Sequence, residues 1–300
     1  MGKYIDLRCD FGFKYCMSDP IIMKSFLNAI LEGDVETITD VKFENVEIPR
    51  KFINQRGVTF DLHCTTENGD SILIEMQNSC QPFFKTRANY YVYRLLDSKI
   101  EKGVEWSKME KDIDRIIGIF ILGEKMADID KVLTCTAECD VETGEIFWNR
   151  HRKYFLTLPL FKLDTNNITT KDIWINLFKN LGRMENIHPS VYTRADEGLL
   201  RLIEKAKVGA LSKDDRAVYE ASLKKLADEM DMEEHGFKKG VKQGIEIGEK
   251  RGIEIGREEG IGIGREEEKL KIARSLKNQG VDICTISIAS GLSIEEIEKL

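Results

Sequence analysis

The chain has 300 residues, of which 42% are hydrophobic and 32% are charged, and its formal net charge is −7. That length allows one folded core of about 150–200 residues with appendages. No apolar run is long enough to cross a bilayer, the longest being residues 116–122, which excludes a membrane-spanning helix. The acidic balance excludes binding of nucleic acid through overall positive charge, although local basic patches can still meet a phosphate backbone.

Cysteine usage indicates the compartment. Seven cysteines, an odd number without a framework spacing, suit a reducing environment. The first residues lack the apolar segment of a signal peptide, so we expect a cytoplasmic protein. We expect the cysteines to be small core residues; they stand at positions 9, 16, 64, 80, 135, 139 and 284. Zinc binding by Cys135, Cys139 and His151 is the alternative, but no second pair has the usual spacing.

Two elements are expected before residue 50. Asp19 followed by Pro20 is typical of a helix start, and apolar residues then recur at near-helical spacing up to Gly33. This pattern predicts a helix with one buried face. Residues 38–48 alternate apolar and polar side chains, which predicts a strand.

Residues 58–77 have the pattern of a β-hairpin. Their turn is Glu67-Asn68-Gly69, in which Gly69 can take the left-handed conformation of a bulge. If Thr66 pairs with Asp70, one face becomes wholly apolar; that face holds Phe60, Leu62, Cys64, Ile72, Ile74 and Met76. A two-residue Asn-Gly turn would shift the pairing by one residue and mix the two faces. The alternation therefore favours the three-residue turn.

The other face of this hairpin carries acidic side chains. In the favoured register Asp61 lies opposite Glu75, and Thr59 lies opposite Gln77. Directly opposed residues have Cβ atoms about 4.5–5.5 Å apart, so the two carboxylates would repel each other unless a cation lay between them. Mg²⁺ binds a few carboxylates together with water and a substrate phosphate, and it assists phosphodiester cleavage. The hairpin therefore predicts a site for a hard divalent cation.

A helix with basic side chains is expected after the hairpin. The strand should break at Gln81-Pro82, before this helix begins. On the helix, Arg87, Tyr91 and Arg94 are three to four residues apart and share a face, with Lys85 nearby. This face either contacts phosphate or forms a solvated or core-edge surface, and the sequence supports both interpretations equally.

Two further strands are expected in the middle of the chain. The continuous apolar run over residues 116–122 predicts a central strand that is buried on both faces. Residues 154–163 predict another strand, in which Pro159 indicates a sheet edge or a bulge.

Helices are expected to dominate the next part of the chain. One of the threonines at 169 and 170 can cap a helix that runs to Leu181. Two more amphipathic helices are expected between residues 190 and 230. The second would be capped by Ser212, with Asp215 at its third helical position.

Glycines recur every four residues from Gly236 to Gly264, with charged residues in the gaps. Eight glycines would destabilise an isolated helix by about 0.8–1 kcal/mol each relative to alanine. The repeat is therefore either a surface for close helix–helix contact or a charged, semi-flexible linker.

The last residues, 269–300, suggest three short helices. Gly280 would end the first, Asp282 would cap the second, and Ser293 with Glu296 would form a capping box for the third. This arrangement resembles a helix-turn-helix unit. Its last helix is acidic, so contact with protein is at least as well supported as the reading of DNA bases.

Two stretches resemble known nuclease sequences. Asp61 followed by Glu75-Met76-Gln77 resembles the catalytic hairpin of the PD-(D/E)XK nuclease superfamily. Residues 10–14 and 25–31 resemble the opening Asp-x-x-Phe-Lys signature and the first long helix of recombination-promoting nucleases. The third motif position is usually Lys, and Gln77 can orient a water but cannot supply a positive charge. The Glu-x-Gln variant is typical of these nucleases and of the related PD-(D/E)XK nuclease family transposases.

The resemblance, which covers residues 4–235, implies roles for individual residues. Asp61 and Glu75 would hold Mg²⁺ or Mn²⁺, and Gln77 would orient the attacking water. Asp10 would bring a further acid to the catalytic site, although capping of a helix is as well supported for it. The residues implied for DNA contact are Lys14, Lys85 and Arg87.

We therefore expect an α/β protein with a PD-(D/E)XK restriction-endonuclease-like core, in which helices flank a mixed central sheet, and a helical C-terminal extension. The expected parts are a nuclease-like domain over residues 1–234, a glycine-repeat helix or linker over 235–268 and a helix-turn-helix-like unit over 269–300. The resemblance implies a bacterial, metal-dependent DNA endonuclease of the recombination-promoting or transposase-like kind. Expected partners are DNA and further copies of the chain through the C-terminal helices, with no membrane. The alternative is a catalytically weak nuclease fold that binds DNA or assembles.

Overall fold

The computed structural model describes residues 2–50, 53–79, 83–100, 102–108, 115–164 and 167–300. They form two compact units that divide between Asp231 and Met232. Helix α8, Lys213–Asn278, contributes residues to both units. The expected strand break at Gln81-Pro82 lies outside the described residues, as does Cys80.

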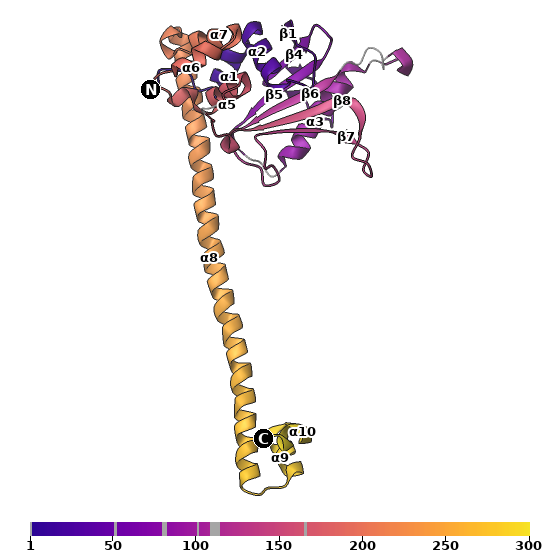
Figure 1. The fold of residues 1–300 in the computed structure, drawn as a ribbon, viewed down its shortest axis with the longest axis vertical. Coiled ribbons are helices and arrows are strands. Elements are labelled where there is room, and N and C mark those ends of the chain that lie inside the picture. The colour runs from indigo at the N-terminus through magenta and orange to yellow at the C-terminus, as the bar shows by residue number, and fades with distance from the viewer. Residues whose placement is uncertain (1, 51–52, 80–82, 101, 109–114, 165–166) are drawn as a thin grey trace. The chain divides into compact units, whose positions relative to one another are not determined.

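A mixed six-stranded sheet forms the centre of the first unit (Figure 1). Its strands follow the order β1 (Val41–Phe43), β4 (Leu62–Thr66), β5 (Ser71–Gln77), β6 (Ile116–Leu122), β8 (Ile146–Thr157) and β7 (Leu133–Cys139). Strands β5, β6 and β8 run parallel to one another, whereas the other neighbours are antiparallel. A second, small sheet pairs β2 (Glu47–Ile48) with β3 (Val58–Thr59). The expected mixed sheet is confirmed.

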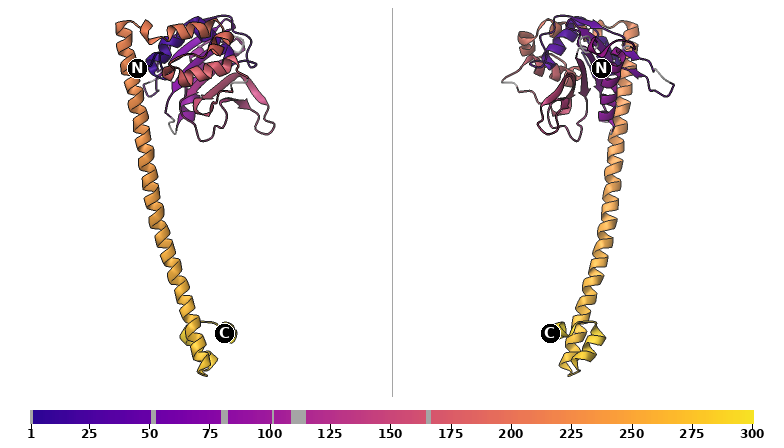
Figure 2. Two further views of the ribbon diagram at one scale, coloured as in Figure 1. Left: turned by 60° about the vertical axis from the view of Figure 1, so that its left-hand side comes forward. Right: turned by 90° about the vertical axis from the view of Figure 1, so that its right-hand side faces the viewer.

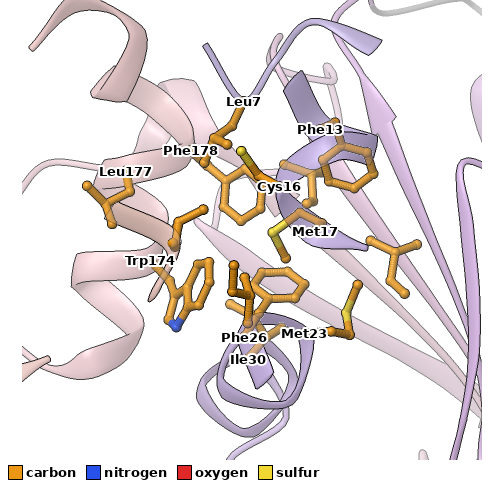
Figure 3. Packing of buried hydrophobic residues seen from close by; sticks show 14 of the residues in the cluster. Leu7, Phe13, Cys16, Met17, Met23, Phe26, Ile30, Trp174, Leu177 and Phe178 are labelled. Atoms are coloured by element: carbon orange, nitrogen blue, oxygen red, sulfur yellow. The ribbon is translucent and has the colours of Figure 1, made fainter. Parts of the chain in front are cut away.

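Helices cover both faces of the large sheet, which Figure 2 shows from two further sides. One face packs on α1 (Asp10–Met17), α2 (Pro20–Ile30), α5 (Thr170–Asn180) and α7 (Glu197–Lys205). The other face packs on α3 (Phe84–Lys99). In the larger of the two cores the ring of Phe26 meets those of Trp174 and Phe178 (Figure 3). Strand β6 is buried along its whole length, as its apolar run predicts.

Local sequence signals set the helix starts. Helix α2 begins after Asp19, whose carboxylate accepts hydrogen bonds from the N–H groups of Ile21 and Ile22. Helix α5 begins after Thr169, which forms a capping box with Asp172. Both helices therefore start where the sequence predicts.

The hairpin has the predicted register over β4 and β5. Leu62 pairs with Ile74, and Cys64 pairs with Ile72. The Thr66 N–H donates to the Asp70 carbonyl at 3.0 Å, and Gly69 has a φ of 85°, the left-handed conformation that the turn requires. The turn residues and the apolar alternation are both local signals, and the sequence therefore sufficed to predict the register of β4 and β5.

The pairing expected near residue 60 is wrong. The predicted register puts Phe60 on the apolar face with Leu62, but its ring packs against Tyr91 of α3 on the opposite face of the sheet. The Phe60 N–H donates to the Val46 carbonyl, and Thr59 pairs with Glu47 rather than lying opposite Gln77. The strand is therefore interrupted between Thr59 and Leu62, because β3 joins a different sheet from β4.

Other strands also differ from expectation. The strand expected over residues 38–48 is divided into β1 and β2, which belong to separate sheets. The strand expected over 154–163 is β8, which ends at Thr157; Pro159 lies in the 3-10 helix η1 (Leu158–Leu160). Strand β8 lies between β6 and β7, so it is not an edge strand. Strand β7 alternates apolar and polar side chains from Leu133 to Cys139, but it is not among the strands expected from the sequence.

Three helices, rather than two, follow residue 188: α6 (Pro189–Arg194), α7 and the start of α8. Helix α8 begins after Ser212, whose Oγ accepts the Asp215 N–H at 3.1 Å, as predicted. Its first turns pack on the N-terminal segment of the chain. The Asp6 N–H donates to the Tyr219 hydroxyl at 2.9 Å, and the Phe11 N–H donates to Ser222 Oγ at 3.1 Å.

In the second unit the glycine repeat is helical and belongs to α8. Two short helices follow, α9 (Ile283–Ser290) and α10 (Ile294–Glu298), and the caps predicted for them are confirmed. With the end of α8 they enclose a small core that holds Ala273, Ile286, Leu292 and Ile297. No helix in the described part of the chain combines the length and apolar character needed to span a membrane.

The cysteines do not all lie in the core. Cys9, Cys16 and Cys64 are buried, as expected, and burial raises the pKa of the Cys64 thiol to about 12. The exposed cysteines are Cys135, Cys139 and Cys284. The first two lie on β7, the outermost strand of the sheet, which explains their exposure.

Truncation tests which part of α8 belongs to the first unit. We expect a chain that ends at Asp231 to fold and melt cooperatively, because the first unit ends there. A chain that ends at Leu211 loses the contacts of Tyr219 and Ser222 and the buried side chain of Leu226. Burial of two large side chains contributes several kcal/mol, so its melting temperature should fall by about 10 °C or more, measured by circular dichroism. Equal melting of the two chains would contradict this division.

Candidate active site

A pocket of ≈ 240 Å³ lies where the end of β5 meets the start of α1 and the first turns of α8. It is lined by Arg8, Cys9, Asp10, Phe13, Asp61, Met76, Gln77, Asn78, Ser79, Ser222, Lys225, Leu226 and Glu229. Three of the four residues predicted as catalytic, Asp10, Asp61 and Gln77, are therefore brought to one pocket. The fourth, Glu75, lies two residues before Gln77 on β5.

Asp61 lies at the interruption between β3 and β4. Its carboxylate accepts a backbone N–H of β5 that a backbone carbonyl would accept in a regular strand pair. Asp61 Oδ2 accepts the Met76 N–H at 2.9 Å, and Asp61 Oδ1 lies 3.7 Å from Lys14 Nζ. Burial raises the pKa of Asp61, and the negative charge of Asp10 acts in the same direction. The Met76 N–H and the Lys14 ammonium act in the opposite direction.

Glu75 is buried in the middle of the sheet, between β4 and β6. Glu75 Oε1 accepts the Asp61 N–H at 2.9 Å. Burial, followed by the charge of Asp61, raises the pKa of Glu75 to about 8, while Arg87 and Lys14 oppose the rise. The two carboxylates thus accept a crossed pair of backbone hydrogen bonds. Glu75 binds the N–H of Asp61 itself, and Asp61 binds the N–H of Met76, the residue after Glu75.

Gln77 is held at both ends of its side-chain amide. Its Nε2 donates to the Ser79 carbonyl at 2.6 Å, and its Oε1 accepts a hydrogen bond from the Arg87 guanidinium. Gln77 therefore connects β5 to α3 and fixes the position of a basic side chain. Orientation of a water by Gln77 stays a prediction.

Asp10 and Lys14 are placed by the tight approach of α1 to the N-terminal segment. A Cβ at Gly12 would lie 2.2 Å from the Asp6 carbonyl oxygen, so only glycine fits between them. Cys9 is the N-cap of α1, with its Sγ accepting the Gly12 N–H, and the capping role considered for Asp10 is therefore wrong. Asp10 instead lies in the first turn and binds the Lys14 ammonium at 2.6 Å. Burial lowers the pKa of Lys14, but Asp10 and Asp61 outweigh it and hold the pKa above its usual value.

The basic face expected on α3 is divided in the structure. The Arg87 guanidinium lies 5.2 Å from the centre of the Phe84 ring and 5.7 Å from that of Tyr91. Arg94 is buried and donates to the Pro49 carbonyl at 2.9 Å and to Asp97 at 2.6 Å, so it is a core-edge residue. Lys85 forms an ion pair with Asp128 at the surface and does not line the pocket.

Sequence reasoning missed the pocket wall that α8 supplies. Ser222, Lys225 and Glu229 face the acids from more than 140 residues away along the chain. The capping signal at Ser212 located the helix start but could not indicate where the helix packs. Arg8 was also missed; both ends of its guanidinium bind the Asp6 carboxylate, at 3.0 and 2.7 Å.

The carboxylate pair fits a hard divalent cation. Two carboxylates whose pKa values are raised by burial would be relieved by a positive charge placed between them, and their oxygens are the ligands that Mg²⁺ and Mn²⁺ prefer. Within the described residues no group of three or more His, Cys, Asp or Glu side chains forms a metal cage. Mg²⁺ in phosphate-processing sites usually takes one or two carboxylates and completes its shell with water and substrate phosphate. The pair matches that mode of binding.

A family model described as PD-(D/E)XK nuclease family transposase matches residues 7–235, well over half of the chain. The chain therefore belongs to this family, which confirms the resemblance seen in the sequence and indicates DNA as a partner. No curated protein and no solved structure matches.

The raised pKa of Glu75 predicts how stability depends on pH without metal. The unfolded chain loses this proton near pH 4.5, whereas the folded protein keeps it up to about pH 8, so the folded state binds more protons in between. Stability should therefore fall as the pH rises from 5 to 8. Glu75→Gln keeps an acceptor for the Asp61 N–H but cannot titrate. Urea unfolding in EDTA should therefore show that the free energy of unfolding of this variant changes less with pH over this range. Parallel pH profiles of the variant and the natural chain would contradict the raised pKa.

Proposed function

We propose that this PD-(D/E)XK nuclease family transposase is a Mg²⁺- or Mn²⁺-dependent DNA endonuclease, similar in activity to the recombination-promoting nucleases. The observation that carries the proposal is the hydrogen-bonded pair of the half-buried Asp61 and the buried Glu75 beside a polar pocket. Burial of two like charges costs free energy and is unlike a purely structural hairpin. Sites that shift pKa values in this way are concentrated where catalysis or ligand binding occurs.

The chemistry is the hydrolysis of a phosphodiester. The oxygen of a water forms a bond to phosphorus, the bond from phosphorus to the leaving sugar oxygen breaks, the water proton passes to solvent, and the leaving oxygen takes up a proton from solvent. A divalent cation held by Asp61 and Glu75 would neutralise charge on the phosphate and lower the pKa of the water. Asp10 adds negative charge at the edge of the pocket, and Gln77 orients the attacking water with its remaining hydrogen-bonding capacity.

Basic side chains on two helices support contact with DNA. Lys14 on α1 and Arg87 on α3 both oppose the raised pKa of Glu75, so their charges act at the site from two sides. Arg87 is presented by Gln77 and by the rings of Phe84 and Tyr91. Lys85, which is half exposed, would meet the DNA backbone farther from the site.

A second candidate function is DNA binding or assembly without efficient cleavage. The bonds from Gln77 to Ser79 and Arg87 favour it, because they occupy much of the amide that would orient a water. The two candidates differ in whether bound metal leads to turnover.

Self-association through α8 is a further part of the proposal. Eight large apolar side chains of the glycine repeat are exposed: Phe237, Val241, Ile245, Ile247, Ile253, Ile255, Ile261 and Ile263. Charge is divided along the segment, because residues 236–250 carry four Lys and two Glu, whereas residues 251–268 carry three Arg and six Glu. An antiparallel pair of segments would bring opposite net charges together and cover the apolar side chains. The free thiols of the described cysteines support a cytoplasmic location.

A plasmid assay tests the cleavage. The protein should nick or linearise supercoiled plasmid in Mg²⁺ or Mn²⁺ and leave it intact in EDTA. Asp61→Asn should reduce the rate by about 10²–10³-fold, the range typical of losing one group that stabilises transition-state charge. Glu36→Gln, which removes an exposed acid that does not line the pocket, should cleave at the natural rate. Metal binding at Asp61 and Glu75 without any cleavage would favour the second candidate function.

Light scattering tests the assembly. The full chain should have at least twice the mass of one copy, and a chain that ends at Asp231 should be monomeric. Asp substitutions at Ile245 and Ile253 should reduce the mass of the full chain, because both side chains are exposed and would be covered in the pair. A monomeric full chain at high protein concentration would refute self-association.

A further inference from the structure

Lys14 occupies an unusual position among the acids of the site. Its ammonium lies 2.6 Å from Asp10 Oδ1 and 3.7 Å from Asp61 Oδ1, and its charge acts on Glu75 as well. One cation thus forms ion pairs with two acids of the site, Asp10 and Asp61. The Lys14 side chain is 45% exposed, so it can still contact a phosphate or a water.

The other cations near the pocket contact other groups, and Arg87 also acts on Glu75 through its charge. The Arg8 guanidinium binds Asp6 with two hydrogen bonds, and the exposed Lys225 is paired with Glu229 at 3.9 Å. Arg87 donates to Gln77 and packs on aromatic rings of α3. Within the described residues that line or border the pocket, Lys14 is the cation whose ammonium forms an ion pair with Asp61.

Gln77 cannot provide a positive charge at this place. It is neutral, and the two ends of its amide bind Ser79 and Arg87. Hydrolysis moves negative charge onto the phosphate oxygens, and a fixed cation in a partly buried site lowers the energy of that charge far more than one in water. A compact ammonium such as that of Lys suits this purpose.

We propose that Lys14 is a catalytic residue, whose ammonium, held at the Asp61 carboxylate by α1, donates hydrogen bonds to the attacked phosphate and the attacking water and supplies the positive charge that Gln77 cannot. Lys14 keeps its proton throughout the hydrolysis. The water proton passes to solvent, as in the hydrolysis described above. The inference rests on the proposed endonuclease function and assigns one of its catalytic groups.

Two simpler roles for Lys14 make different predictions. An Asp10–Lys14 pair that only supports α1 contributes about 0.3–0.5 kcal/mol, and its loss would leave turnover unchanged. A lysine that only contacts the DNA backbone would change KM and the affinity for DNA, and would leave kcat unchanged.

The proposal is tested by variants that remove the positive charge at position 14 and place one at position 77. The variants are Lys14→Met, which keeps the apolar stem, Lys14→Met combined with Gln77→Lys, and Lys24→Met on α2 as the matched control. Lys14→Met should lower kcat by about 10²-fold or more, with KM within about threefold of the natural value. The double variant carries a lysine on β5 in place of the one lost from α1, and its kcat should be at least tenfold higher than that of Lys14→Met. Lys24→Met should behave as the natural chain.

Binding of Mn²⁺, measured by electron paramagnetic resonance in the absence of DNA, gives a readout that does not depend on turnover. Removal of a positive charge beside Asp61 should tighten Mn²⁺ binding about tenfold in Lys14→Met, and the double variant should reverse this gain. Unchanged kcat in Lys14→Met, a loss confined to KM, or no recovery in the double variant would overturn the proposal. If the natural chain binds Mn²⁺ but does not cleave, the endonuclease function fails. The Mn²⁺ affinities then show separately whether the charge of Lys14 acts on the carboxylate site. Equal affinities of the natural chain and Lys14→Met would exclude such an action.

Discussion

The site depends on a crossed pair of hydrogen bonds, in which Glu75 accepts the Asp61 N–H and Asp61 accepts the Met76 N–H. Each carboxylate accepts a backbone N–H from the opposite strand of the hairpin, at 2.9 Å in both cases. These bonds hold the two carboxylates close together in a partly buried position. Burial raises the pKa of both groups and the charge of Asp61 raises that of Glu75 further, while the bound N–H groups act in the opposite direction. The interruption of the strand at Asp61 makes the arrangement available, because a regular ladder would use the same N–H groups for backbone carbonyls.

The rest of the first unit places charge around this pair. Helix α1 brings Asp10 and Lys14 to the Asp61 side, and Gly12 allows its close approach to the N-terminal segment. Helix α3 brings Arg87, which Gln77 binds from the end of β5. The start of α8 closes the pocket. Three helices from distant parts of the chain thus meet at one hairpin. This arrangement agrees with the membership of the chain in a family of nuclease-fold transposases.

The sequence predicted what local signals determine. The turn at Gly69, the register of β4 and β5, and the caps of α2 and α5 follow from neighbouring residues, and the structure confirms them. The position of Phe60 depended on packing against Tyr91, and strand alternation cannot report such a contact. The wall formed by α8 likewise depends on long-range contacts such as that of Tyr219 with the Asp6 N–H. The closeness of Asp61 and Glu75 was predictable because the hairpin register places the two acids opposite each other.

Anomalous diffraction from crystals soaked in Mn²⁺ locates a bound ion without reference to activity, and it therefore tests whether Asp61 and Glu75 form the metal site. We predict one strong peak within coordination distance of both the Asp61 and Glu75 carboxylates, and loss of that peak in Asp61→Asn. Manganese bound at another group of side chains, or equal peaks in the natural chain and the variant, would contradict the assignment of this pair as the metal site.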